Sequence, residues 1–116
     1  MMLFKPEHAQ MILRRKKTQT RRTGRKRWKV GKIYQAKTGH RGSEPFAYLL
    51  ITGLRQEFLG QITDQDACRE GYPHIPGYRK IWKKINGRWD PHQLVWVVDF
   101  ELATEVEYQA QRKGAA

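Results

Sequence analysis

The sequence predicts an α+β domain in which helices flank a small barrel or a curled mixed sheet. Two observations lead to this fold class. The order of elements is one helix, several strands, two helices and a closing strand, and helices that are grouped apart from a run of strands are typical of α+β folds. The length of 116 residues suits one domain and is too short for two.

A helix is expected to open the domain, from Pro6 to about Lys16. Proline suits the first turn of a helix, and the acidic Glu7 beside it interacts favourably with the positive end of the helix dipole. An extended segment follows this helix, and residues 38–45 form a loop because they are rich in Gly, Ser and Pro. Strands are predicted over residues 30–37 and 46–54, with a further short strand over 56–61.

Two helices and a strand complete the domain. Thr63 followed by Asp66 is typical of a capped helix start, and Gly71 suits the end of that short helix. A second helix carries an apolar stripe at helical spacing, formed by Tyr78, Ile81, Trp82 and Ile85. Residues 94–102 are the clearest strand. The polar residues 105–116 are expected to be a frayed tail, so that the domain spans residues 1–104.

Positive charge is concentrated in one part of the chain. The protein carries a net charge of +12, and the segment from Arg14 to Lys29 holds ten of its 23 Lys and Arg residues and no acidic residue. The remaining residues hold thirteen basic and eleven acidic side chains, a net charge of only +2. Such a segment is typical of polyanion binding. Nucleic acid, with RNA ranked first, is therefore the expected partner. A membrane surface is not expected, because no lipid-seeking amphipathic helix accompanies the charge.

Composition also disfavours several functional classes. Cys68 is the only cysteine, so no disulfide can form within the chain, which suits a reducing compartment. The four histidines are scattered without the spacing of metal ligands, so we expect neither a metal nor another cofactor. The apolar runs are too short to cross a bilayer, and the N-terminal residues lack a secretory signal. A cytoplasmic location is the expectation.

Residues 17–22, KTQTRR, resemble the signature of the ASCH domain family, a branch of the PUA-like fold. That signature is usually Gly-x-Lys-x-x-Glu-x-Arg after the first helix. Lys17 and Arg22 take the lysine and arginine places. Arg15 stands where glycine is usual, and Thr20 stands where many members have glutamate. The resemblance covers about residues 3–102 and implies a PUA-like small barrel or curled mixed sheet with flanking helices.

The threonine form of the signature is similar to that of small bacterial ASCH amidohydrolases that deacylate N4-acetylcytidine. In that subgroup a lysine, a threonine and a later glutamate form the catalytic set, and Glu70 in the segment DACREG takes the glutamate place. The resemblance therefore implies that Lys17 acts as a base or polarising cation, Thr20 as a nucleophile or orienting hydroxyl, and Glu70 as their partner. By composition alone the three would be a solvated cation, an ordinary strand residue and a carboxylate at a helix end.

The other basic residues of the charged segment are expected to contact phosphate groups. Trp28 lies among these cations and Trp89 lies in a loop, so both are candidates for stacking on a base. Trp82 and Trp96 belong to apolar stripes and are expected in the core. The predicted nucleic-acid-binding residues are Arg14, Arg15, Lys16, Arg21, Arg22, Arg25, Lys26, Arg27, Trp28, Lys29 and Trp89.

Three functions remain open on the sequence, two of them enzymatic. The first is nucleic-acid binding, with a cleft for one nucleotide beside the Lys-Thr-Glu set. The second is an amidohydrolase acting on N4-acetylcytidine or a related modified nucleoside, and the third is a metal-independent ribonuclease. The charge ranks nucleic-acid binding first, because a polymer explains so concentrated a positive segment and a small substrate does not.

Overall fold

The computed structural model describes residues 1–114, and its centre is a five-stranded sheet with the order β1-β3-β4-β5-β2. Strand β1 runs parallel to β3, and all other neighbours are antiparallel. The strands are β1 (Met2–Leu3), β2 (Gln19–Arg22), β3 (Ile33–Lys37), β4 (Ala47–Phe58) and β5 (Leu94–Ala103). The helices are α1 (Pro6–Leu13), α2 (Asp64–Arg69), α3 (Ile75–Asn86) and α4 (Glu105–Gly114), with a 3-10 turn over Leu59–Gln61. The predicted α+β class with a curled mixed sheet is confirmed.

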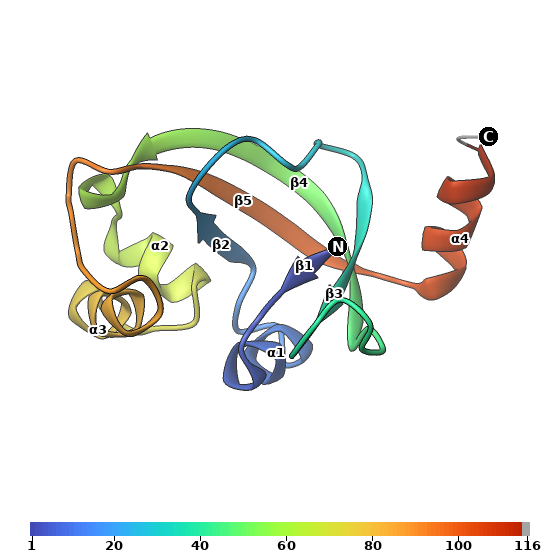
Figure 1. Cartoon of the computed structure of the whole chain (residues 1–116), viewed down its shortest axis with the longest axis horizontal. Helices are drawn as coiled ribbons and strands as arrows, with labels where there is room; N and C mark the ends of the chain where they lie inside the picture. The colour runs from blue at the N-terminus through green and yellow to red at the C-terminus, as the bar shows by residue number, and fades with distance from the viewer. Residues whose placement is uncertain (115–116) are drawn as a thin grey trace.

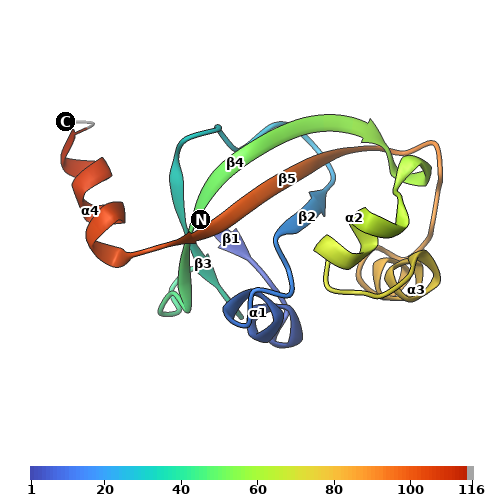
Figure 2. The same ribbon diagram turned by 180° about the vertical axis from the view of Figure 1, so that it is seen from behind.

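Strands β4 and β5 form an arch that crosses the whole molecule, with α1, α2 and α3 below it (Figures 1 and 2). The two strands expected over 46–54 and 56–61 are one continuous strand, because every residue from Gly53 to Phe58 has a partner on β5. A register shift between Ile51 and Gly53 bends this strand. A Cβ at Gly53 would lie 2.8 Å from an oxygen of Asp99, so the close approach of the two strands there requires glycine.

Helix α1 begins at the expected proline but ends at Leu13 instead of about Lys16. The chain leaves the helix through Arg15, whose φ of 61° lies in the left-handed region. The next two backbone N–H groups, of Lys16 and Lys17, both donate to the carbonyl group of Met11 and close the helix end. A left-handed residue favours glycine. This conformation is the physical reason why glycine suits the position that Arg15 takes in the ASCH signature.

Replacing Arg15 by glycine is expected to stabilise the protein. The left-handed conformation costs an L-residue about 1–2 kcal/mol, and the extra freedom of glycine in the unfolded chain offsets part of this gain. We expect the free energy of unfolding, measured by urea denaturation, to rise by up to about 1 kcal/mol. Lys16→Gly is the matched control, because Lys16 does not have a positive φ, and it should lower stability. A loss of stability in Arg15→Gly would contradict the argument.

The predicted ends of α2 are confirmed. The Thr63 hydroxyl group accepts a hydrogen bond from the Asp66 N–H at 3.1 Å and caps α2. Gly71, with a φ of 100°, follows the end of α2, and Gly87 caps α3 with a φ of 92°. Two members of the predicted stripe on α3 are buried, whereas Ile85 at its end is 47% exposed. Both helices cover the same end of the β4–β5 arch (Figure 1).

The core consists of two hydrophobic clusters. The first includes Phe4, Ile12 and Phe100, and so joins the N-terminal segment and α1 to the sheet. The second includes Tyr78 and Trp82 of α3 together with residues of α2 and β5. Side chains from both clusters line one pocket, which therefore lies where the two clusters meet.

The prediction of a frayed tail is wrong for residues 105–114, which form α4, and residues 115–116 lie outside the described part. The ring of Tyr108 packs on that of Tyr48 in β4, with centroids 4.9 Å apart. The side-chain amide of Gln111 accepts a hydrogen bond from the Ile33 N–H at 2.7 Å and donates one to the Gly31 carbonyl group at 2.9 Å. Among the helices of residues 1–114, none has the length and hydropathy needed to cross a membrane.

Candidate functional site

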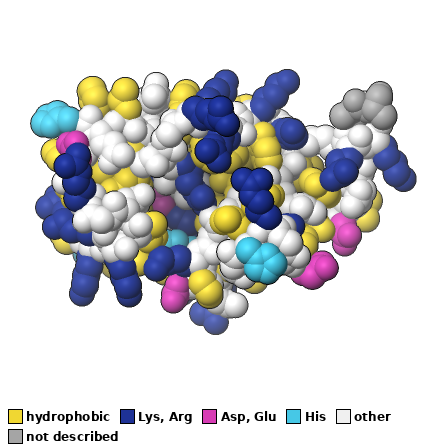
Figure 3. Space-filling view, viewed as in Figure 1, with side chains coloured by type: hydrophobic (Ala, Val, Ile, Leu, Met, Phe, Trp, Pro, Cys, Tyr) yellow, Lys and Arg dark blue, Asp and Glu magenta, His cyan; other side chains and the backbone are white. Residues whose placement is uncertain are grey.

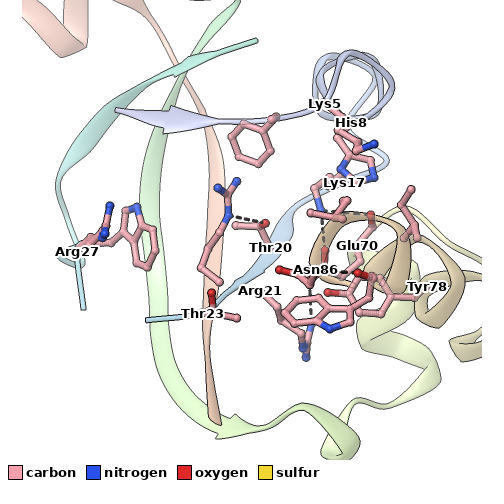
Figure 4. Close-up of a pocket in the computed structure, with 16 residues that line it drawn as sticks. Lys5, His8, Lys17, Thr20, Arg21, Thr23, Arg27, Glu70, Tyr78 and Asn86 are labelled. Carbon is pink, nitrogen blue, oxygen red and sulfur yellow. Dashed lines mark hydrogen bonds and ion pairs between the residues drawn. The ribbon is translucent and has the colours of Figure 1, made fainter. Parts of the chain in front are cut away.

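A pocket of about 410 Å³ opens between α1, α3 and the segment that follows β2 (Figure 4). A hollow with basic and acidic side chains is visible on this face in the space-filling view (Figure 3). The volume suits a small ligand such as a nucleoside. Its lining residues are Phe4, Lys5, His8, Lys17, Thr20, Arg21, Arg22, Thr23, Arg27, Trp28, Glu70, Tyr78, Ile81, Trp82, Ile85 and Asn86. All three predicted catalytic residues are therefore in one pocket.

Lys17 reaches the pocket because the start of β2 is tied to the end of α2. The Thr18 N–H donates to the Arg69 carbonyl group at 2.7 Å, and Glu70 follows Arg69 directly. The buried Lys17 ammonium group donates to Glu70 Oε1 at 2.6 Å, to the Gln19 carbonyl group at 3.0 Å and to the Glu70 carbonyl group at 3.4 Å. These acceptors use all three of its N–H bonds. Lys17 is thus held in one position and is almost fully buried.

Burial changes the acid–base chemistry of Lys17. Its side chain is 2% exposed, and this burial lowers the pKa of Lys17 below its usual value, although the Glu70 carboxylate opposes part of the shift. Desolvation disfavours the charged form of an amine, so the neutral form becomes more accessible. A neutral amine that lines a pocket can act as a general base.

Arg21 is the centre of a buried ion-pair network. Its side chain has no exposed surface, and its guanidinium group contacts Glu57 Oε1 at 2.9 Å, Glu70 Oε2 at 3.0 Å and Asp66 Oδ2 at 3.2 Å. Arg21 was predicted to bind phosphate, and in the structure its charge is paired with carboxylate groups inside the protein. The same network also orients the Glu70 carboxylate group. Glu70 places one carboxylate oxygen on Lys17 and the other on Arg21, so the orientation of this carboxylate is set from both sides.

Thr20 and Arg22 line the pocket together from the same strand. The Arg22 Nε–H donates to Thr20 Oγ1 at 3.3 Å, and its Nη2 donates to the Leu3 carbonyl group at 2.8 Å. The guanidinium carbon of Arg22 lies 4.7 Å from the ring centroid of Phe4, which supports it from one side. A positively charged donor on the Thr20 oxygen stabilises negative charge that develops there. Thr20 therefore has a partner suited to a nucleophilic hydroxyl.

Comparison with solved structures identifies the fold around this site. The ASCH domain from Lactobacillus crispatus superposes with a TM-score of 0.67 at 16% identity, covering 83% of this chain and 70% of that chain. The chain has the fold of an ASCH domain. An ASCH protein from Zymomonas mobilis, solved as a point variant, superposes with a TM-score of 0.62 at 12% identity over 95% of this chain and 75% of that chain. A protein from Enterococcus faecalis assigned to the family model DUF984 gives 0.62 at 16% identity over 84% and 70%.

No protein-family model matches the sequence, and no curated protein matches it either. The superpositions establish the fold, and because the sequence identities are only 12 to 16%, the chemistry is argued from this chain's own residues. The predicted ASCH and PUA-like architecture is thus confirmed by structure. Within residues 1–114, no three His, Cys, Asp or Glu side chains gather as they would around a metal ion.

His8 and Tyr78 line this pocket, although neither was predicted as a site residue. His8 comes from α1, and its Nε2 lies 2.7 Å from the Tyr72 hydroxyl group. Burial, assisted by the positive charge of Lys17, lowers the pKa of His8 to about 4, so its ring is neutral at pH 7. Tyr78 was expected in the core, and it also lines the pocket. Burial and the negative charge of Glu70 raise the pKa of Tyr78, so its hydroxyl group stays protonated and can donate a hydrogen bond.

The sequence offered one signal for His8. It stands one helical turn before Ile12, on the apolar side of α1, where a histidine is buried together with its neighbours.

The basic segment is not one continuous surface of the domain. Strand β2 carries Arg21 into the interior and the half-buried Arg22 into the pocket, and Lys17 is buried just before it. The exposed cations fall into two groups on either side of this strand. Arg14, Arg15 and Lys16 follow α1, and Arg25, Lys26, Arg27 and Lys29 lie in the loop between β2 and β3. Of these exposed cations, Arg27 alone lines the pocket in the part of the chain that the structure describes.

The two tryptophans proposed for base stacking are less accessible than the sequence suggested. Trp28 is 7% exposed and belongs to the first hydrophobic cluster, so it reaches the pocket only as part of its wall. Trp89 is half-buried against Tyr78 and Trp82, with ring centroids 6.3 and 6.5 Å apart, and does not line the pocket. Trp82 is buried as predicted. Trp96 is half-buried and packs against the first cluster.

Proposed function

We propose that the protein is an amidohydrolase that removes an acyl group from the amino group of a nucleobase, with N4-acetylcytidine as the reference substrate. One observation carries the proposal. Lys17 and Glu70 form a buried pair 2.6 Å apart, and they share a nucleoside-sized pocket with the Thr20 hydroxyl group. These are the residues that the resemblance to the deacylating ASCH subgroup implies. The proposal now ranks above nucleic-acid binding, because the buried cations Lys17 and Arg21 are explained by their carboxylate partners without a polymer.

The pocket suggests a sequence of steps for this hydrolysis. Neutral Lys17 takes the proton of the Thr20 hydroxyl group as its oxygen attacks the acyl carbonyl carbon. The Arg22 Nε–H, which already donates to that oxygen, stabilises the negative charge that the oxygen gains as its proton leaves. The proton held by Lys17 then passes to the nitrogen of the leaving base, and a water molecule hydrolyses the acyl ester. Acetate leaves, and Thr20 regains its hydroxyl group.

Glu70 and Tyr78 have supporting roles in this scheme. Glu70 accepts a hydrogen bond from Lys17 and compensates its charge after each proton transfer, so that no uncompensated ion is left in the buried site. The protonated hydroxyl group of Tyr78 is a donor for a polar atom of the base. Apolar side chains of α3, among them Ile81, provide a surface for its ring.

The pH dependence of wild-type turnover tests the proposal directly. Purified protein is incubated with N4-acetylcytidine, and the release of cytidine and acetate is measured. Because the base form of Lys17 is neutral, the rate should increase as pH rises through the Lys17 pKa. Burial lowers the pKa of Lys17, so the rise should begin at a lower pH than it would for an ordinary lysine. Absence of turnover over the whole pH range would refute the proposal.

Nucleic-acid binding is the second candidate function. Arg27 lines the pocket, and Arg25 and Lys26 precede it in the same exposed loop. The loop between β2 and β3 therefore places cations where the backbone of a strand would pass if one of its bases entered the pocket. Phosphate contacts of this kind provide affinity without sequence preference.

Neutralising Arg25, Lys26 and Arg27 together is expected to weaken RNA binding. Each lost contact with a single strand reduces the slope of log K against log salt by about 0.7, so three contacts reduce it by about 2. Fluorescence anisotropy over a salt series measures both affinity and slope. Release of acetate from free N4-acetylcytidine, measured in parallel, should change little. An unchanged affinity for RNA would exclude this loop as a binding surface.

A further inference from the structure

A second cavity lies at the other end of the basic loop, between the start of β3 and helix α4. It has a volume of about 700 Å³ and contains no residue of the Lys-Thr-Glu pocket. Its lining comes from chain segments that are far apart in sequence. These residues are Met1, Lys29, Val30, Gly31, Lys32, Ile33, Tyr34, Gln35, Tyr108, Gln111 and Arg112. We call this cavity the β3–α4 groove.

Hydrogen bonds join the chain segments that line the groove. Gln111 of α4 bridges the groove, because its side-chain oxygen accepts from the Ile33 N–H and its side-chain nitrogen donates to the Gly31 carbonyl group. The Lys29 N–H donates to the Tyr34 hydroxyl group at 3.0 Å and fixes the opposite side. Helix α4 therefore has a defined position against the loop, and the groove is preformed.

Two cations lie against aromatic rings in this groove. The Lys32 ammonium group lies 5.2 Å from the ring centroid of Tyr34, and the guanidinium carbon of Arg112 lies 5.6 Å from that of Tyr108. Both tyrosine rings are half-buried, whereas Lys29, Lys32 and Arg112 are exposed. Within residues 1–114, the groove lining contains no Asp or Glu. The groove thus presents three positive charges that have no carboxylate beside them in its lining.

We propose that the β3–α4 groove binds a single strand of nucleic acid. Lys29, Lys32 and Arg112 contact its phosphates, and the rings of Tyr34 and Tyr108 contact its bases. A groove that combines cations with aromatic side chains matches the two chemical features of such a strand, its charged backbone and its flat bases. A duplex is a poorer ligand, because its bases are stacked on one another and do not reach the tyrosine rings.

The groove and the pocket are connected through the chain. Trp28 lines the pocket and the next residue, Lys29, lines the groove. The exposed loop cations before Trp28 therefore lie along the chain between the two cavities. The inference extends the second candidate function to a surface that includes α4, and it does not depend on hydrolysis in the pocket.

A charge-reversal experiment tests the groove. The double variant Lys32→Glu and Arg112→Glu changes two exposed groove residues, and the double variant Lys80→Glu and Lys84→Glu is the matched control. Both control residues are exposed on α3 and line neither cavity. Fluorescence anisotropy measures binding of a labelled single-stranded RNA, a DNA strand of the same sequence and the corresponding duplex. Circular dichroism and thermal melting establish that each variant is folded.

The groove variant should bind the single strands at least about tenfold more weakly than the wild type, with a salt slope lower by about 1.4, since each lost contact removes about 0.7. The control should keep most of the wild-type affinity. Wild-type affinity in the groove variant, an equal loss in the control, or tighter binding of the duplex than of the single strand would each overturn the inference. Acetate release from N4-acetylcytidine is measured on the same samples. A protein without this activity can still show the groove effect, so the two proposals fail separately.

Discussion

Replacing Lys17 by alanine is expected to abolish the release of acetate from N4-acetylcytidine. The variant has no group to accept the proton of Thr20, and general-base catalysis by a positioned side chain contributes about 10²- to 10⁴-fold to a rate. We therefore expect kcat/KM to fall by at least about 10²-fold. The loss should appear mainly in kcat, because Lys17 acts on the reacting atoms and the wall of the pocket remains.

Three further variants separate chemistry from folding in this experiment. Lys17→Arg keeps a positive charge but removes the base, since arginine stays protonated in proteins. It should be as inactive as Lys17→Ala. Thr20→Ser keeps a hydroxyl group beside Arg22 and should retain measurable activity, whereas Thr20→Val should not. Activity in a folded Lys17→Ala protein would contradict the assigned role. The same variant also tests the ribonuclease alternative, because RNA cleavage in chelator that persists without Lys17 does not come from this pocket.

Replacing Glu70 by alanine is expected to cause a large loss of stability in addition to the loss of activity. The Glu70 side chain is 2% exposed and contacts both Lys17 and Arg21. Its removal leaves the Lys17 charge buried without a carboxylate partner. Breaking a buried ion pair in this way costs about 3–5 kcal/mol. Urea denaturation, followed by circular dichroism, measures the change in the free energy of unfolding.

A matched control and a rescue identify the cause of this loss. Glu57→Ala removes another partner of Arg21, but the Glu57 side chain is 15% exposed and Arg21 keeps Asp66 and Glu70, so the loss should be smaller. Combining Lys17→Met with Glu70→Leu removes both charges of the pair. The double variant should recover part of the stability that Glu70→Ala loses, because no unpaired lysine remains. Equal stability of the Glu57 and Glu70 variants would show that the buried pair has no special energetic role.

Much of the fold follows from local patterns in the sequence. Thr63 and Gly71 mark the ends of α2 because capping and left-handed glycine are properties of a few neighbouring residues. The stripe of Tyr78 and Trp82 predicts the buried side of α3 for the same reason. The prediction of the end of α1 was less accurate. A left-handed Arg15 cannot be recognised from residue type, because only glycine signals that conformation clearly.

Local sequence patterns do not predict the role of each basic residue. Arg21 and Arg22 are adjacent and chemically identical, yet one is enclosed by three carboxylates and the other lines the pocket beside Thr20. Side chains of neighbouring residues in a strand point in opposite directions. Only the packing of α2 against β2 decides which of the two directions faces carboxylate groups. The helical form of residues 105–114 was missed for a related reason. The contacts of α4 are with β4 and with the start of β3, far away in the sequence.

The sequence by itself determined the fold class, most of the elements and, through its resemblance to the ASCH signature, the identity of the three candidate catalytic residues. Only the tertiary structure decided that these residues share one pocket and that the basic segment is divided by a buried strand. The physical reason is the range of the interactions. Caps and apolar stripes act within one or two helical turns, whereas the Lys17–Glu70 pair joins positions 53 residues apart and the Arg21–Glu70 pair joins positions 49 apart. Such pairs exist only after β2 and α2 have packed together.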